Sequence, residues 1–443
     1  MQRRRLLDRL WLPFLTGLLW ASSVAAASPP RKTLTRFHDP VIVSTSLLAG
    51  LADHRTAQSR LYSARRGVLV PIPFQFDARH GDGDVVFPDT AADQEFVFDD
   101  NDELVFMAKD TGDRVPRSVL PSQSDAALEI AVTDPLTGEQ GWTYLLHFPG
   151  APPPRSPVTY ATFDVQTNQA RTPLYTMEYY PGRNFFTGMR IAPAAGGTGE
   201  NILDRMKVRV NPTFSLLLTS WSPLFTEEDF SVKIDGVKNG AVRAIRRVRQ
   251  WLNLGKFFPH VPGGTVYTYY YFSSFSTPSK FSIPWLVLKA LRGFRFVGAN
   301  DFRNSAIGMT YWDAANPQGL PYTGHNHATV NRSQDHGWWV VSGRGGTCLH
   351  AFVIPEQWRK WGIARGTIFT DDSGMTDAEG PEDNPGSFLA GYSLLHMTNL
   401  RQPGVYDMNL AVFILPHPYR PGDEAQPLAM LKHPLRAKVH PVE

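Results

Sequence analysis

The sequence predicts a mainly β protein made of two β-sandwich-type domains with few short helices. Short segments in which apolar and polar residues alternate follow one another along most of the chain, as residues 127–133 (ALEIAVT) show. This period of two places one face of a strand on a core. The 36 glycines and 36 prolines fit many turns between short strands. Heptads, repeats of fixed period and low-complexity tracts are absent from the sequence.

The first half of the chain begins with a polar stretch that includes a possible short helix near residues 45–53. Strand-like segments then follow almost without interruption, at residues 69–76, 104–109, 127–133, 142–148 and 158–165. A stiff connector at 151–157 (APPPRSP) and a flexible one at 194–199 (AAGGTG) bracket the domain boundary. We place it near residue 180, giving domains at 28–180 and 181–443.

The second half is also mainly β, with two ambiguous segments. In residues 241–252 (AVRAIRRVRQWL) apolar residues recur every three positions, which favours a helix, but the preceding Asn239-Gly240 is typical of a hairpin turn. We favour the strand. Residues 284–294 are compatible with a helix that has Pro284 in its first turn. Residues 355–362 (PEQWRKWG) are the clearest short helix.

Residues 1–27 have the order of a secretory signal peptide: three arginines, an apolar stretch, and small residues before a cleavage site near Ala27. An uncleaved anchor and a twin-arginine signal are the alternatives. We therefore expect a periplasmic or secreted protein, soluble after cleavage. The mature chain would hold 40 basic and 40 acidic residues, because residues 1–27 contain four and one. This balance argues against a nucleic-acid partner.

The densest group of ligand-capable residues lies between Tyr311 and His350. His325 and His327 are two positions apart, so on an extended chain both imidazoles leave the same face and could share a transition metal with His336. Asp313 or Asp335 could add an oxygen ligand or orient an imidazole. The alternative is that these histidines bond loop backbone or lie at the surface.

The same segment supports catalysis without a metal. A histidine base, Arg332 as charge stabiliser and Tyr311 or Tyr322 as acid would suit β-elimination of an acidic polysaccharide. The adjacent Trp338 and Trp339 must point to opposite faces of a strand, so one of them could stack on a ligand.

Two further features concern calcium and the single cysteine. Carboxylates and an amide cluster before an apolar strand and could hold a structural Ca²⁺, the residues being Asp99, Asp100, Asn101, Asp102 and Glu103. A solvated turn is the alternative. Cys348 cannot form a disulfide within the chain, and we expect a buried, inert thiol in a strand that pairs with residues 337–343, with His350 near Val340.

Several segments resemble secreted bacterial carbohydrate-active proteins with sandwich and super-sandwich domains, such as polysaccharide lyases and mutarotase-like proteins. They are residues 230–236 (FSVKIDG), 239–249 (NGAVRAIRRVR), 294–302 (FRFVGANDF) and 404–424 (GVYDMNLAVFILPHPYRPGDE). The resemblance covers about residues 200–420 and includes no diagnostic motif. It implies a site on a concave sheet face or in a cleft edged by loops, where His, Tyr and Arg are often catalytic.

Three functions follow as hypotheses. The first is carbohydrate processing, by lyase or hydrolase chemistry on a polysaccharide or oligosaccharide. The second is a non-catalytic binding or accessory protein of the envelope that uses an aromatic surface. The third is a metal-dependent enzyme that uses His325, His327 and His336.

Overall fold

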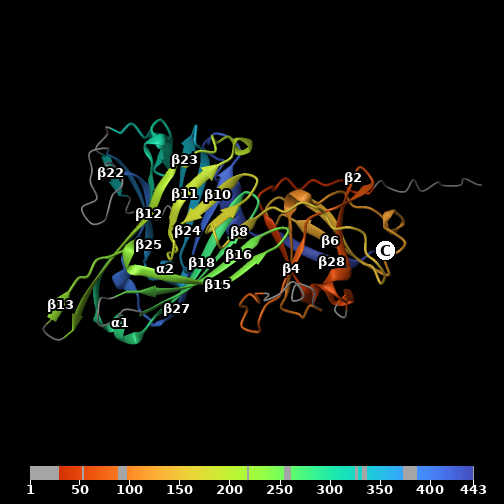
Figure 1. The fold of residues 1–443 in the computed structure, drawn as a ribbon, viewed down its shortest axis with the longest axis horizontal. Helices are drawn as coiled ribbons and strands as arrows, with labels where there is room; N and C mark the ends of the chain where they lie inside the picture. The colour runs from red at the N-terminus through yellow and green to blue at the C-terminus, as the bar shows by residue number, and fades with distance from the viewer. Residues whose placement is uncertain are drawn as a thin grey trace, which may run out of the picture.

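A computed structural model describes residues 29–51, 54–87, 97–216, 219–253, 261–324, 328–331, 337–372 and 387–442. The predicted signal peptide lies outside these ranges and stays a prediction. The described chain is mainly β, with five sheets and three short α-helices, which confirms the predicted fold class. It forms a larger and a smaller lobe side by side (Figure 1). Among the described residues, no helix is long and apolar enough to cross a membrane.

The smaller lobe packs a five-stranded sheet, in the order β28-β6-β7-β2-β3, near a three-stranded sheet, β1-β5-β4. Its strands are β1 (Pro40–Ser44), β2 (Ser59–Arg65), β3 (Val68–Pro71), β4 (Gln75–Asp77), β5 (Glu103–Met107), β6 (Ala126–Thr133), β7 (Gln140–His147) and β28 (Arg436–Pro441). Leu104, Phe106, Ile130 and Leu145 share one apolar core. β28 comes from the far end of the chain and lies beside β6 (Figure 1).

The larger lobe contains the other three sheets. The nine-stranded sheet has the order β15-β16-β17-β18-β27-β24-β23-β20-β21. Its strands are β15 (Phe230–Asn239), β16 (Ala244–Leu252), β17 (Val261–Tyr270), β18 (Ser274–Ile283), β20 (Thr310–Asp313), β21 (Asn316–Pro321), β23 (Trp338–Gly343), β24 (Gly346–Val353) and β27 (Gly404–Leu415).

The seven-stranded sheet has the order β13-β12-β19-β26-β25-β22, with β14 paired to β12. Its strands are β12 (Leu203–Leu216), β13 (Thr219–Trp221), β14 (Phe225–Thr226), β19 (Leu291–Phe302), β22 (Ala328–Asn331), β25 (Ala364–Asp372) and β26 (Ser387–Leu395). A four-stranded sheet holds β8 (Thr162–Asp164), β9 (Gln169–Arg171), β10 (Tyr175–Tyr179) and β11 (Phe186–Ile191).

The largest apolar core lies between the two large sheets. Phe352 of β24 and Tyr392 of β26 stack across it with ring centroids 3.9 Å apart. Alternate residues of each strand supply this core, in agreement with the period of two in the sequence.

The structure decides the secondary structure of the segments that the sequence left ambiguous. Residues 244–252 form β16, which bonds to β15 on one side and β17 on the other, so the strand interpretation is confirmed. The other helices are α1 (Trp285–Ala290) and α2 (Glu356–Lys360), both where the sequence allowed them. The short helix expected near residues 45–53 is a 3-10 helix at Thr45–Leu51.

The β23–β24 hairpin corrects one register. His350 lies opposite Trp339, and Val340 lies opposite Leu349. We expected His350 near Val340, one residue away from its observed partner. The difference arises because Gly343 pairs with Gly346, which leaves only Arg344 and Gly345 in the turn. Gly346 has φ +104°, a conformation that favours glycine.

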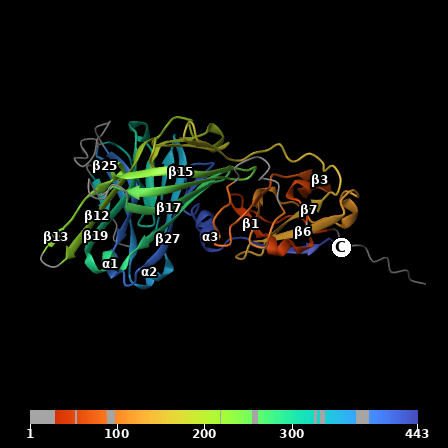
Figure 2. The ribbon, with the colours of Figure 1, turned by 60° about the horizontal axis from the view of Figure 1, so that its bottom comes forward.

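The domain boundary at residue 180 stays a prediction. Two strand pairings join residues from both sides of it. The β8–β11 sheet spans residues 162–191 and so crosses the boundary, and β28 completes the sheet of the smaller lobe. The remaining helix, α3 (Ala425–Lys432), lies between the two lobes (Figure 2), just before the chain returns to β28.

Candidate ligand-binding cleft

The predicted residues of the central segment divide into two groups. Five of them lie outside the described residues, namely His325, His327, Arg332, Asp335 and His336, so their roles as ligands, base or charge stabiliser stay predictions. The described neighbours fix where this segment leaves and rejoins the fold. Backbone N–H groups of Thr323 and Gly324 donate to the Asp371 carboxylate at 2.9 and 2.8 Å, and the Gly337 carbonyl accepts from Phe352 N at 2.8 Å.

The structure brings Tyr311 and Asp313 together, but inside the core. The Asp313 Oδ2 atom accepts from the Tyr311 hydroxyl at 3.0 Å and from Thr367 Oγ1 of β25 at 2.8 Å. Its Oδ1 atom accepts from the backbone N–H groups of Ala315 and Asn316. The buried carboxylate therefore ties the β20–β21 turn to the opposite sheet. This geometry explains a structural role, and the predicted ligand role stays untested.

Tyr322 is equally buried, and its hydroxyl donates to the Leu389 carbonyl at 3.3 Å. Burial raises its pKa well above the ordinary value for tyrosine. Its predicted role as acid would require a substrate to reach a fully enclosed side chain.

The two tryptophans lie on opposite faces of β23, as predicted. Trp339 is buried and stacks on His350 with ring centroids 4.7 Å apart, while Trp338 is half-buried. His350 accepts from Asn300 Nδ2 at 3.0 Å, and burial lowers the pKa of His350 to about 3. Cys348 is buried, and burial raises its pKa to about 12, which fits an inert thiol.

The acidic segment is tied together by its own hydrogen bonds. The Asp102 carboxylate accepts from the backbone N–H groups of Arg79 and Asp99, and Asp99 accepts from Asn101 N. Glu103 Oε2 lies 2.7 Å from Arg79 Nη2 and 2.6 Å from Arg243 Nη2. These contacts are those of a braced turn before β5. The calcium site at Asp99, Asp100, Asn101, Asp102 and Glu103 stays a prediction.

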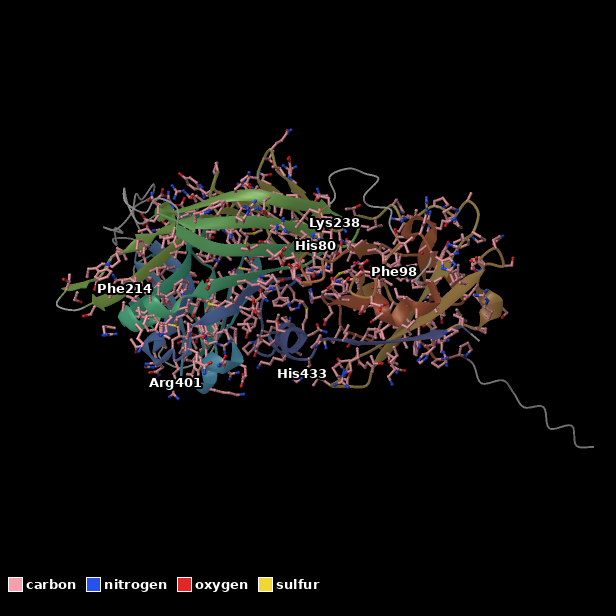
Figure 3. All side chains as sticks on the ribbon, turned by 90° about the horizontal axis from the view of Figure 1, so that it is seen from below. His80, Phe98, Phe214, Lys238, Arg401 and His433 are labelled. Atoms are coloured by element: carbon pink, nitrogen blue, oxygen red, sulfur yellow. The ribbon has the colours of Figure 1, made fainter. Side chains whose placement is uncertain are left out.

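Arg243 is the centre of a buried ionic network where the two lobes meet. It donates to Asp77 of β4 at 2.8 Å and to Glu103 of β5 at 2.6 Å, and Lys238 Nζ reaches Asp77 at 2.8 Å. Burial alone would raise the pKa of Asp77, but the charges of Arg243 and Lys238 hold it below its ordinary value. Lys238 lies at this junction (Figure 3), where its Nζ atom donates to the Phe76 carbonyl of the smaller lobe at 2.8 Å. A cleft of about 150 Å³ adjoins the network, lined in part by Gln75, Lys238 and Arg155.

A larger cleft, of about 210 Å³, opens between the two large sheets. Aromatic side chains dominate its wall, namely Phe185, Phe186, Phe230, Phe281, Phe296, Phe352 and Tyr392. Asn184, Gln250, Thr277, Ser279 and Lys280 supply the polar groups. None of the described lining residues is acidic. We refer to this space as the inter-sheet cleft.

Behind one wall of the inter-sheet cleft lies Arg246 of β16. Its Nη1 atom donates to Asn184 Oδ1 at 2.5 Å, and its guanidinium carbon lies 4.3 Å from the centre of the Tyr179 ring. The side chain is 1% exposed, and within the described chain its Nε and Nη2 atoms have no hydrogen-bond partner. The Thr277 hydroxyl in the cleft wall is also buried without a partner. Buried polar groups of this kind can bond water, an ion or a ligand.

Our reading of the sequence overlooked Arg246 and the cleft. The signal was present in residues 244–248, where a strand places Arg246 on the same face as Ala244 and Val248. An arginine between two small apolar residues on a core face is a buried cation.

A metal-capable group also escaped notice. In the described part of the chain, His54, Asp125 and His147 bring their ligand atoms within 4.8 Å of one another. They lie in the smaller lobe, and their spacing of 71 and 22 residues follows no known metal motif.

Comparison with known proteins gives a weak likeness to carbohydrate-active enzymes. No family model and no curated protein matches the chain. A glycosyl hydrolase family 38 protein from Enterococcus faecalis is 8% identical with a TM-score of 0.47, covering 93% of this chain and 47% of that one. An alpha-mannosidase from Enterococcus faecalis V583 is 8% identical with a TM-score of 0.46, covering 93% and 46%.

A shorter protein from Salmonella typhimurium, assigned provisionally as a mutarotase, is 6% identical with a TM-score of 0.28, and the match covers 58% of this chain and 97% of that one. The chain spans about half the length of the two Enterococcus chains. Similarity at this level does not establish a shared activity.

Proposed function

We propose that this protein binds an acidic saccharide in the inter-sheet cleft. The observation that carries the proposal is Arg246, a buried cation that no described acidic side chain pairs with, next to a cleft lined by aromatic rings. A buried charge without an opposite partner is costly, and an anionic ligand group would offset that cost.

The cleft wall suits the rest of a sugar. Aromatic side chains that line the cleft, such as Phe281, suit contact with the C–H side of a pyranose ring, and Gln250 and Thr277 can bond its hydroxyls. Lys280 is exposed and adds a positive charge at the cleft. An acidic substituent is expected because the described lining holds one basic and no acidic residue.

The test is calorimetry with uronic-acid, sulfated and neutral oligosaccharides. We expect an acidic oligosaccharide to bind wild type and to bind Arg246→Met at least about tenfold more weakly, the usual cost of losing a charged hydrogen bond. Arg249→Met is the matched control, since Arg249 lies on the opposite face of β16 and pairs with Asp235 at 2.7 Å. Equal loss in both variants, or preference for neutral sugars, would contradict the proposal.

Processing of the bound saccharide by lyase or hydrolase chemistry is the second candidate. His336 directly precedes Gly337 in the sequence, and the Gly337 carbonyl accepts from the backbone N–H of Phe352, a residue of the cleft wall. In β-elimination a base takes the proton next to the carboxylate, the C–O bond to the leaving sugar breaks, and that oxygen gains a proton. The unsaturated product absorbs ultraviolet light, and we expect its formation to stop in His336→Ala while binding persists. If the wild-type protein binds the saccharide but forms no product, the function would be that of a non-catalytic binding protein of the envelope.

A further inference from the structure

Three potential metal ligands meet at the edge of the smaller lobe. His147 is the last residue of β7, Asp125 directly precedes β6, and the two lie together because Ala126 pairs with His147. β2 pairs with β7 at Ser59 and His147, which brings the chain just before it, including His54, to the same place. The sheet thus assembles the group from three distant segments.

The donor atoms face one another. His147 Nδ1 lies 2.7 Å from Asp125 Oδ1, and the His54 ring packs edge-on against His147 with centroids 4.0 Å apart. The His54 Nδ1 atom is buried and has no hydrogen-bond partner in the described chain. Gln58 Oε1 lies 3.4 Å from His147 Nε2, the ring nitrogen that points away from Asp125, and so helps to orient the imidazole.

We propose that His54, Asp125 and His147 form a binding site for a divalent transition metal of the zinc type. Two imidazoles and one carboxylate are a common zinc set with a fourth position open to water. Ligand atoms at about 2.0–2.2 Å from a tetrahedral ion lie about 3.3–3.6 Å apart. The observed donor atoms lie within 4.8 Å of one another, so binding would require the widest pair to close by at most about 1.5 Å. The Asp125 side chain is 44% exposed, which leaves a path for the ion.

The test is zinc titration by calorimetry on the full mature chain after chelator treatment. We expect about one zinc per chain and at least about tenfold weaker binding in His54→Ala. His80→Ala is the control, because His80 is an exposed histidine of the same lobe (Figure 3). Asp125→Asn is a second variant at an exposed side chain, and circular dichroism verifies that each variant is folded.

The double variant His325→Ala, His327→Ala separates this site from the one predicted in the central segment. Retention of zinc in that variant and its loss in His54→Ala would support the proposal. Loss of zinc in the central variant alone, equal loss in His80→Ala, or no zinc binding by folded wild type would overturn it.

A second observation concerns the far end of the larger lobe. Helix α1 and the β12–β13 hairpin both project there (Figure 2), and the Phe214 and Trp221 rings touch with centroids 5.2 Å apart. Four large apolar side chains in this part of the lobe are exposed: Trp221 47%, Trp285 60%, Leu286 61% and Val405 67%. We call these four residues the apolar tip. Exposed groups of this size usually mark an interaction site.

Positive charge surrounds the apolar tip. Residues 219–224, 280–295 and 401–407 contain five basic residues and one acidic residue, Asp407. Lys280, Lys289, Arg292, Arg295 and Arg401 are all exposed. Lys289 Nζ lies 5.5 Å from the centre of the Trp285 ring. Tryptophan and leucine beside lysine and arginine form the pattern of a surface that lies on an anionic bilayer.

We also propose that the apolar tip docks the protein on an anionic phospholipid membrane. The apolar side chains would enter the headgroup region and the surrounding cations would contact lipid phosphates. The occupant is a membrane and not a second copy, because two such tips would bring two basic surfaces together.

The test is sedimentation of the mature protein with vesicles. We expect binding to vesicles that mix phosphatidylglycerol with phosphatidylcholine, and at least about fivefold weaker binding to phosphatidylcholine alone. Trp285→Ser with Leu286→Ser should lower binding at least about tenfold. Val68→Ser is the control, as Val68 is 65% exposed on the other lobe.

Concentration-dependent dimerisation that the tip variant abolishes would overturn this proposal in favour of a second copy. Absence of vesicle binding by folded wild type, or equal binding by the tip variant, would also overturn it.

Discussion

Arg243 and Arg246 stand three residues apart, and each is 1% exposed, yet their surroundings differ. Arg243, at the junction of the lobes, contacts two carboxylates and the Tyr271 hydroxyl. Arg246, behind the inter-sheet cleft, contacts one amide and two aromatic rings. The first arrangement is complete without a ligand, whereas in the second the Nε and Nη2 atoms have no hydrogen-bond partner among the described residues. The comparison separates a cation that holds the fold from one that is available for binding.

The largest effect is expected for the paired cation. Arg243→Met would leave the buried Asp77 carboxylate with Lys238 alone and the half-buried Glu103 with Arg79 alone, and we expect a loss of about 3–5 kcal/mol in the free energy of unfolding. Urea denaturation measures it. The double variant Arg243→Met, Asp77→Asn should recover part of the loss, and a change below about 1 kcal/mol in the single variant would break the comparison.

Arg246→Met should behave in the opposite way. The free energy of unfolding should change by no more than about 2 kcal/mol, because the variant removes a stacked cation and leaves no buried acid unpaired. Affinity for an acidic oligosaccharide should fall by about 1.5–3 kcal/mol. Denaturation and calorimetry on the same preparation measure both quantities. A loss of stability as large as that of Arg243→Met would show that the two cations are alike.

Two buried histidines, His350 and His38, should make the stability of the protein depend on pH. Burial lowers the pKa of His350 to about 3, and burial followed by the His417 charge lowers that of His38 to about 4. Below the unfolded pKa of about 6.5 the unfolded chain takes up protons that the folded chain does not, so stability falls with falling pH. Each histidine should contribute about 1.4 kcal/mol per pH unit from pH 6.5 to its folded pKa.

Denaturation of wild type and His350→Gln at pH 7 and pH 5 measures this dependence. The variant should lose less stability than wild type over that interval. An equal loss would place the titrating groups elsewhere.

The smallest effect is expected at the edge of the cleft. Lys280 is exposed, and Lys280→Gln should weaken acidic-ligand binding by about 0.2–1 kcal/mol, with greater weakening at low salt. Calorimetry at two salt concentrations measures it. A loss equal to that of Arg246→Met would move the anion site from the buried guanidinium to the surface.

The sequence predicted the architecture better than the site. Alternation in residues 127–133 and the hairpin signal at Asn239-Gly240 depend on neighbours in sequence, and both strands are present. The inter-sheet cleft and the His54, Asp125 and His147 group depend on which strands become neighbours, and local pattern does not contain that information. Asp313 shows the converse. Its residue type suggested a ligand, but the partners Tyr311 and Thr367 converge on it only in the folded chain.

The position of β28 has a consequence for the timing of biosynthesis. β6 pairs with it across a separation of about 300 residues, so the five-stranded sheet cannot close while the larger lobe is being made. At about 5–20 residues per second, the edge of β6 waits on the order of 15–60 s for its partner. During that interval Leu128, Ile130 and Val132 belong to a strand with an open edge, the kind of edge that pairs with other chains. Until β28 has been synthesised, a nascent chain of this protein therefore needs either a chaperone bound to the open edge or a low rate of collision with other nascent chains.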